Sequence, residues 1–288
     1  MLAQEYLRRI LKARVYDVAQ ETPLDYAVHL SEKLDNKVLL KREDLQPVFS
    51  FKLRGAYNRM VHLTAEEKAR GVITASAGNH AQGVALAASR LKCRAVICMP
   101  ITAPSVKVEA VKRFGGKYVE VVQEGRSFTE SADCAARLQR ERNLVFVHPF
   151  NDPDVIAGQG TIGLEIMDDL PDVDTIVVPI GGGGLASGVA SAVKMLHPNV
   201  RVIGVQAAGA AGMKASIEAG HVVSLDTAKT IADGIAVKKP GELTFALCSK
   251  YLDEIVTVDD DEIAQAILFL MERGKMVAEG AGAAPVAA

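Results

Sequence analysis

Between residues 71 and 205, short apolar runs alternate with longer stretches that have one apolar face. The apolar runs are expected as strands at 72–75, 95–99, 118–122, 145–148, 175–180 and 200–205. The stretches between them are expected as helices at 79–91, 104–114, 128–142, 155–170 and 185–196. Strands that are apolar on both faces are typical of a parallel sheet covered by helices. The pattern therefore predicts an α/β protein with mostly parallel sheets.

The two ends of the chain carry a looser version of this pattern. Further helices are expected at 1–16, 24–34, 50–62, 242–252 and 260–273, and further strands at 38–40 and 255–258. Ser50 is a suitable N-cap for the third of these helices, because its hydroxyl can accept a backbone N–H. That start places Lys52 in the first helical turn.

The composition is that of a globular protein. The 288 residues are 49% hydrophobic and 24% charged, which is enough to bury a sizeable core. The net charge is −2, and no Lys/Arg-rich run is present, so neither nucleic acid nor an anionic membrane is expected as a partner. Charges interrupt the apolar positions of residues 1–16, which argues against a signal peptide or a membrane span. We therefore predict a cytoplasmic protein.

Four cysteines and six histidines are scattered along the chain, without a C-x-x-C pair. The cysteines are expected as buried free thiols. Their spacing and that of the histidines do not suit a set of zinc ligands, so no metal is predicted.

Four consecutive glycines, Gly181 to Gly184, follow the apolar run at 176–180 and precede a helix pattern that begins at Leu185. Glycines let the backbone turn tightly, and a helix start adds N–H groups and a positive end. This combination suits a phosphate group, although a tight turn without a ligand would show the same pattern. The run is not a P-loop, since no Gly-Lys-Ser/Thr follows, and a nucleotide-binding module built on the glycines alone is the weaker alternative.

Two further stretches place polar chemistry at helix starts. Ser50-Phe51-Lys52-Leu53-Arg54-Gly55 offers a primary amine, which can form a Schiff base with an aldehyde, as a guanidinium cannot. The plain alternative is a surface lysine whose stem rests on apolar neighbours. Ser76-Ala77-Gly78-Asn79-His80 lies between a strand and a helix pattern, where N–H groups suit a carboxylate. Here the alternative is that Ser76 and Asn79 only cap the helix and that His80 is structural.

Taken in order, the motifs S-F-K-x-R-G, S-A-G-N-H-A-Q-G and G-G-G-G-L resemble the pyridoxal-phosphate (PLP) enzymes of the tryptophan-synthase-β fold type. Within that group they look like the threonine/serine ammonia-lyases (threonine dehydratases). Val155 to Thr161 and Glu279 to Gly282 extend the resemblance over almost the whole chain. The resemblance implies PLP fold type II, with two three-layer α/β/α domains. A small domain at 71–148 would be inserted in a large PLP-binding domain at 1–70 plus 149–288.

The resemblance also implies roles for single residues. Lys52 would carry pyridoxal 5'-phosphate as a Schiff base and, once substrate has displaced it, would remove the Cα proton. The residues implied in cofactor binding are Lys52, Phe51, Asn79, Gly181, Gly182, Gly183, Gly184 and Leu185. Those implied in substrate binding are Ser76, Gly78, Asn79 and His80. Phe51 would wall the cofactor ring or serve as a core aromatic, and Asp233-Gly234 would lie near the ring or form a turn.

The implied reaction is the α,β-elimination of L-threonine, and of L-serine, to a 2-oxo acid and ammonia, in isoleucine biosynthesis or threonine catabolism. Ala77 stands where serine racemases of the family carry a second serine, which favours elimination over racemisation. Gln206 and Gly212 replace the acidic residues that bind a divalent cation in the racemases, so no such metal is expected. A homo-oligomer is expected by analogy.

Family members continue to a Ser-Gly-Gly-Asn segment whose serine bonds the pyridine nitrogen, and residues 1–288 do not contain it. A form that ends at Ala288 is therefore expected to bind the cofactor poorly, to turn over slowly or to be unstable. The alternatives are a serine racemase, another β-hydroxy amino acid lyase, or a truncated, non-catalytic PLP-binding protein.

Overall fold

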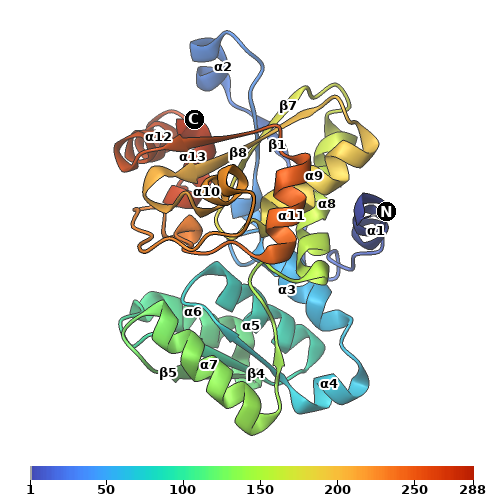
Figure 1. Cartoon of the computed structure of the whole chain (residues 1–288), viewed down its shortest axis with the longest axis vertical. Coiled ribbons are helices and arrows are strands. Elements are labelled where there is room, and N and C mark those ends of the chain that lie inside the picture. Colours follow the sequence, from blue (N-terminus) through green and yellow to red (C-terminus); the bar gives the residue numbers. More distant parts are fainter. Residues whose placement is uncertain (1) are drawn as a thin grey trace. The chain divides into compact units, whose positions relative to one another are not determined.

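Packing divides the chain into two units in the computed structural model, which describes residues 2–288 (Figure 1). The lysine unit, named for Lys52, consists of Lys12–Glu21 and Glu43–Gly158. The glycine unit, named for its four-glycine run, consists of the residues up to Leu11, Thr22–Arg42 and Gln159–Ala288. The division by packing thus groups 43–70 with 71–148, and the inserted domain expected at 71–148 stays a prediction.

A four-stranded parallel sheet forms the centre of the lysine unit, in the order β5-β4-β3-β6. Its strands are β3 Val72–Ala75, β4 Ala95–Met99, β5 Val119–Gln123 and β6 Val145–Phe146. Its helices are α3 Lys52–Val61, α4 Ala65–Arg70, α5 Asn79–Leu91, α6 Ser105–Gly115 and α7 Phe128–Arg142, with 3-10 turns at Glu43–Leu45 and Gly116–Tyr118. A helix crosses over between successive strands, which is what a parallel arrangement requires.

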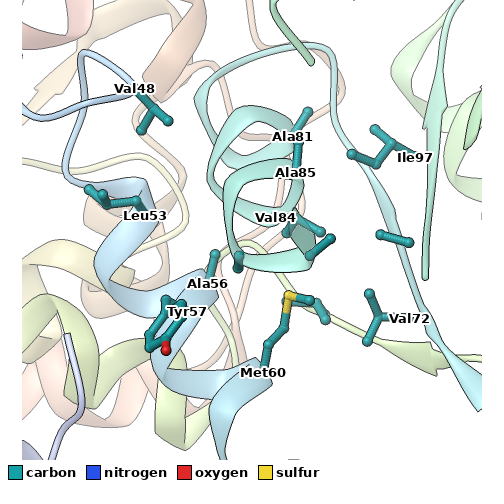
Figure 2. Packing of buried hydrophobic residues seen from close by; sticks show 14 of the residues in the cluster. Val48, Leu53, Ala56, Tyr57, Met60, Val72, Ala81, Val84, Ala85 and Ile97 are labelled. Carbon is teal, nitrogen blue, oxygen red and sulfur yellow. The ribbon is translucent and has the colours of Figure 1, made fainter. Parts of the chain in front are cut away.

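Alternate residues of β3 and β4 face two different helical layers. Val72 and Ile97 pack with α3 and α5, and Figure 2 shows Leu53 of α3 and Ala85 of α5 in this cluster. The residue after Val72, Ile73, packs on the other side with α7. Every residue of β3 and β4 is buried. The lysine unit therefore has the α/β/α layering that continuous apolar strands predict.

The glycine unit contains a second parallel sheet, β7-β8-β9, and a separate antiparallel pair, β1-β2. The strands are β1 Leu24–Tyr26, β2 Leu39–Lys41, β7 Thr175–Pro179, β8 Arg201–Ala207 and β9 Glu254–Val258. The helices are α1 Leu2–Leu11, α2 Val28–Leu34, α9 Gly184–Leu196, α10 Gly212–Ala219, α11 Glu242–Tyr251, α12 Asp260–Glu272 and α13 Gly280–Ala287, with 3-10 turns at Ala208–Ala210 and Asp233–Ile235. Helix α8, Pro153–Asp169, begins in the lysine unit and ends in the glycine unit. Among residues 2–288, none of the helices is long and apolar enough to cross a bilayer.

The parallel sheets and their helical cover confirm the α/β class, and the local exceptions have physical reasons. The helix expected over 24–34 is wrong for its first residues, because Leu24–Tyr26 pair with β2 as a strand. Ser50 is not the N-cap of α3: Phe51 occupies that position, and the buried Ser50 hydroxyl has no hydrogen-bond partner among the described residues. Helices α4, α10 and α13 were not predicted, because segments of six to eight residues are too short to show a helical period.

Candidate functional site

The backbone around Lys52 is fixed by two glycines on neighbouring helices. A Cβ on Gly83 of α5 would lie 3.0 Å from the carbonyl carbon and oxygen of Lys52. A Cβ on Gly158 of α8 would lie 2.7 Å from the carbonyl oxygen of Arg54 and from Cα of Gly55. Only glycine permits such close approaches, so α5 and α8 hold the first turn of α3 tightly.

Arg54 anchors the same turn through a buried ion pair. Its Nε and Nη2 each donate to a carboxylate oxygen of Glu43 at 2.8 Å, and its side chain is fully buried. Nη2 also donates to the carbonyl of Gln20 at 3.1 Å, and Gln46 Nε2 donates to that carbonyl at 2.8 Å. A bidentate pair of this kind fixes geometry strongly, and loss of one partner would leave an uncompensated buried charge.

The Lys52 amine is held by the chain rather than extended into solvent. Nζ donates to the carbonyl oxygen of Pro149 at 3.2 Å and lies 5.2 Å from the centroid of the Phe51 ring. Both Phe51 and Lys52 are half-buried. This is the setting of a positioned amine beside an aromatic face, as a cofactor with an aldehyde and a ring would need.

The Ser76-Ala77-Gly78-Asn79-His80 stretch forms the turn from β3 into α5. Ser76 N donates to the Cys98 carbonyl of β4 at 3.1 Å, and Gly78 N donates to Ser76 Oγ at 3.2 Å. The helix then begins at Asn79 with Gly78 at its N-cap, so the alternative that Ser76 caps the helix is wrong. Because glycine has no side chain, the first turn of α5 keeps its positive end open to an anion.

His80 is buried and neutral. Its Nε2 donates to the Val147 carbonyl at 3.0 Å, which makes Nδ1 the acceptor nitrogen of the ring. Burial, and then the charge of Lys52, lower the pKa of His80 from 6.5 to about 3. Nδ1 is itself buried, with no hydrogen-bond partner in the described part of the chain. Since a neutral acceptor cannot bind a carboxylate, a contribution of His80 to carboxylate binding has to come from its backbone N–H.

His148, which is absent from the residues predicted from the sequence, organises the turn after β6. Its Nδ1 accepts the backbone N–H of Phe150 at 3.1 Å and that of Asn151 at 2.8 Å. Burial lowers the pKa of His148 to about 4, although the charge of Asp152 opposes the shift, so the ring is neutral above that pH. The usable sequence signal is a His-Pro-Phe-Asn run directly after an apolar strand pattern, where a side chain has to organise the turn.

In the glycine unit, the four glycines form the turn from β7 into α9. Gly183 is at the N-cap of α9 with φ +94°, a conformation that glycine adopts without strain. A Cβ there would lie 2.6 Å from Met213 Cε and 2.9 Å from Thr244 Cβ. Thr244 Oγ1 donates to the Gly182 carbonyl at 2.6 Å, which fixes the loop. Helix α9 thus begins at Gly184 with backbone amides and no capping side chain from Gly183 itself.

The Asp233–Ile235 turn packs against the glycine loop, and Ala232, the residue before the turn, packs against the start of α13. A Cβ on Gly181 would lie 3.0 Å from Cα of Ile235. A Cβ on Gly280 would lie 2.8 Å from Cα of Ala232. The Glu279-Gly280-Ala281-Gly282 motif therefore supports the loop through close packing, and Asp233-Gly234 forms a 3-10 turn beside it.

The predicted site residues fall into two sets. Phe51, Lys52, Ser76, Gly78, Asn79 and His80 belong to the lysine unit, and Gly181, Gly182, Gly183, Gly184 and Leu185 belong to the glycine unit. The first set offers a primary amine, an aromatic face and an open helix start, and the second offers a rigid turn of backbone amides. An aldehyde bonds the amine and a phosphate suits the amides, so the residues present fit pyridoxal phosphate.

Comparison with known proteins agrees with this fit. A family model described as pyridoxal-phosphate dependent enzyme matches residues 15–288. The chain is 55% identical over 288 residues to the biosynthetic L-threonine dehydratase IlvA of Burkholderia multivorans, covering 100% of this chain and 57% of that protein. It is 55% identical over 272 residues to the L-threonine ammonia-lyase of Thermotoga maritima, covering 94% of this chain and 67% of that protein.

Solved structures match over nearly the whole chain. The processed form of threonine deaminase isoform 2 from Solanum lycopersicum matches with a TM-score of 0.95 and 49% identity, over 99% of this chain and 82% of that one. Maize serine racemase matches with a TM-score of 0.93 and 36% identity, over 98% of this chain and 84% of that one. These matches confirm the expected fold type II. By its sequence and its fold, the chain belongs to the family of pyridoxal-phosphate-dependent enzymes.

Proposed function

We propose that this chain catalyses the α,β-elimination of L-threonine to 2-oxobutanoate and ammonia, with pyridoxal 5'-phosphate as its cofactor. The observation that carries the proposal is 55% identity to proteins named L-threonine dehydratase and L-threonine ammonia-lyase, over 94–100% of this chain. The chain spans 57% and 67% of the length of those two proteins. Their activity therefore supports the proposal but belongs to longer proteins.

Lys52 is the proposed catalytic residue. When bound, pyridoxal phosphate supplies an electron sink for the negative charge that develops at Cα of the substrate. Lys52 would hold the cofactor through its amine, and its Nζ, once free, would accept the Cα proton of the substrate. The glycines behind α3 and the Arg54–Glu43 pair support this role, because they hold the backbone that carries the amine.

Two open helix starts are the proposed anion sites. Gly181 to Leu185 at the start of α9 would bind the cofactor phosphate, and Ser76 to His80 at the start of α5 would bind the substrate carboxylate. Each start directly follows a parallel strand, β7 or β3, and ligands of open α/β sheets bind at that end of the strands. The resemblance supports Asn79 as partner of the phenolic oxygen and Phe51 as a wall of the cofactor ring.

Serine racemisation is the second candidate, because the similarity to maize serine racemase extends over 98% of the chain. Ala77 disfavours it, since a methyl group cannot exchange a proton on the second face of the substrate. Gln206 is fully buried and donates to the carbonyls of Ile180 and Ala210 at 3.3 and 3.2 Å. Its amide is thus engaged with the backbone, which supports a function without a divalent cation. L-serine as a substrate, a homo-oligomer and a cytoplasmic location stay predictions from the sequence.

The test is to incubate the purified protein with pyridoxal phosphate and L-threonine and to measure 2-oxobutanoate. Cofactor content is measured in the same sample from its visible absorbance. Release of 2-oxobutanoate is the expected result. A sample that holds the cofactor but releases no 2-oxo acid would contradict the proposal and favour a non-catalytic PLP-binding protein. D-serine formed from L-serine, without pyruvate, would favour the racemase.

A further inference from the structure

One peptide plane connects the side chain of His148 with the amine of Lys52. His148 Nδ1 accepts the N–H of Phe150 at 3.1 Å, and Lys52 Nζ donates to the carbonyl oxygen of Pro149 at 3.2 Å. This N–H and this carbonyl belong to the same peptide unit, which is trans like every described peptide bond. In a trans peptide the two groups point in opposite directions. The histidine on one side of the plane therefore sets the direction of the lysine acceptor on the other.

The turn resists rotation of this plane. Asn151 N donates to the same Nδ1 at 2.8 Å, so the imidazole holds two successive amides. The ring of Pro149 restricts its own φ angle. The rings of Phe146 and Phe150 meet the imidazole edge-on, at centroid distances of 6.0 and 4.5 Å. These contacts fix both the turn and the orientation of the histidine ring.

The chain on the other side of His148 is held as well. The Val147 carbonyl accepts Thr74 Oγ1 at 2.9 Å and His80 Nε2 at 3.0 Å. Val147 N donates to the Ile73 carbonyl at 2.9 Å. Because β3 and α5 fix the residue before it, His148 transmits the position of the sheet to the peptide plane that faces Lys52.

We propose that the turn from His148 to Asn151 is the docking site for the Lys52 amine and that His148 is its positioning residue. With one N–H held by the Pro149 carbonyl, the amine has a restricted rotation about its terminal carbon–nitrogen bond. When this amine is deprotonated, its lone pair is confined to the two remaining staggered positions, which accelerates bond formation with a correctly placed aldehyde. The inference rests on the proposed role of Lys52.

Two substitutions distinguish the two nitrogens of the ring. In His148→Asn the amide oxygen stands at the position of Nδ1, and in His148→Gln it stands at the position of Nε2. The measurement is the rate at which borohydride fixes the pyridoxyl group on Lys52 after cofactor-free protein is mixed with pyridoxal phosphate. We expect this rate to stay within about twofold of wild type in His148→Asn and to fall about tenfold in His148→Gln.

His62→Ala is the matched control. His62 Nδ1 bonds the Asn58 carbonyl at 2.7 Å at the far end of α3, so its loss should leave the trapping rate unchanged. Thermal unfolding of each variant reports whether it is folded. Equal trapping rates in folded His148→Asn and His148→Gln would overturn the inference. If Lys52 of the wild-type protein traps no cofactor, the proposed function itself fails.

A measurement on the wild-type protein covers the case in which His148→Gln does not fold. The nitrogen chemical shifts of the labelled His148 ring at about pH 7 should show the proton on Nε2 and an accepting Nδ1. A proton on Nδ1 would overturn the inference, because that nitrogen could then accept neither Phe150 nor Asn151.

Discussion

Two groups of helix starts in this protein differ in what satisfies their first backbone N–H groups. Helices α7 and α12 begin with reciprocal capping boxes. In α7, Glu130 N donates to Ser127 Oγ and Ser127 N to the Glu130 carboxylate, both at 3.2 Å. In α12, Asp259 and Glu262 make the same exchange at 2.8 Å. Helices α5 and α9 begin at Gly78 and Gly183 instead, residues without a side chain to offer.

This difference indicates which helix starts offer backbone N–H groups to a ligand. A capping box satisfies the orphan amides internally and stabilises the helix by roughly 1 kcal/mol. A glycine start gives up this stabilisation and leaves the positive end of the helix to an anion. The glycine starts of α5 and α9, unlike that of α11 at Gly241, directly follow parallel strands, at the sheet end where ligands bind in this class of fold. Closing an open start should therefore weaken ligand binding without loss of stability, whereas opening a capped start should lower stability without a change in ligand binding.

The largest effect is expected from Gly183→Ala. The added Cβ would meet Met213 and Thr244 and would force a positive φ on alanine, so the loop has to move. We expect the free energy of unfolding to fall by about 2 to 4 kcal/mol. Affinity for pyridoxal phosphate should fall about a hundredfold, as charge-assisted bonds to the phosphate are lost. Denaturant unfolding and a cofactor titration measure the two effects.

Gly220→Ala is the control for Gly183→Ala. Gly220 also has a positive φ, +73°, but nothing lies within 4 Å of its added Cβ. Its cost should be about 1 to 2 kcal/mol of strain alone, with cofactor affinity unchanged. Equal losses of cofactor affinity in the two variants would contradict the phosphate role of the glycine loop.

A smaller effect is expected from closing the start of α5 with Gly78→Asp. Nothing lies within 4 Å of a Cβ on Gly78, so the carboxylate can cap the helix and occupy the place proposed for the substrate carboxylate. We expect KM for L-threonine to rise about tenfold or more, whereas stability is unchanged or slightly higher. Gly78→Asn has the same shape without the charge and should raise KM less. An unchanged KM in a folded Gly78→Asp variant would remove α5 from the substrate site.

The pH dependence of stability tests His80 and His148, the two histidines whose pKa values are lowered. The pKa values of His80 and His148 are lowered from 6.5 to about 3 and about 4, so the unfolded chain binds more protons below pH 6.5. Their contribution to stability is therefore present above pH 6.5 and is lost as the pH falls toward 4. Each histidine contributes a slope of at most about 1.4 kcal/mol per pH unit. Unfolding curves between pH 7 and 4.5 should be less pH-dependent in His148→Asn than in wild type; identical slopes would contradict the shift.

The smallest effect is expected from opening a closed start with Ser127→Ala. Loss of the cap should lower the free energy of unfolding by about 1 kcal/mol. Cofactor affinity and KM should not change, because α7 is capped by its own side chains and carries none of the proposed site residues. A lower cofactor affinity in Ser127→Ala would contradict the assignment of capped helix starts to stability and of open ones to ligand binding.

Much of the fold could be predicted from the sequence, because a strand that is buried on both faces is a continuous apolar run. The bounds expected for β3, β4, α5 and α7 are those of the structure. The predictions of secondary structure were wrong where tertiary contacts determine the local conformation. Leu24–Tyr26 are a strand only because β2 pairs with them, and Ser50 is passed over as N-cap in favour of Phe51.

The candidate site divides in the same way. Lys52 and the glycine run could be singled out, because an amine and a turn of bare amides are properties of single residue types in a local pattern. The His-Pro-Phe-Asn run marks His148 only as a residue that organises a turn, since its link to Lys52 passes through the peptide plane of Pro149, which only the folded turn shows. The neutral state of His80 likewise depends on burial and on the charge of Lys52, both of which lower its pKa and both of which only the folded chain shows.

The most direct test of the central claim is borohydride reduction of the cofactor-loaded protein, followed by peptide mapping. The pyridoxyl mass should appear on the peptide that contains Lys52 and should disappear in Lys52→Arg, which keeps the charge but cannot bond the aldehyde. A pyridoxyl group on a different lysine, or protein that retains no cofactor at all, would contradict the account.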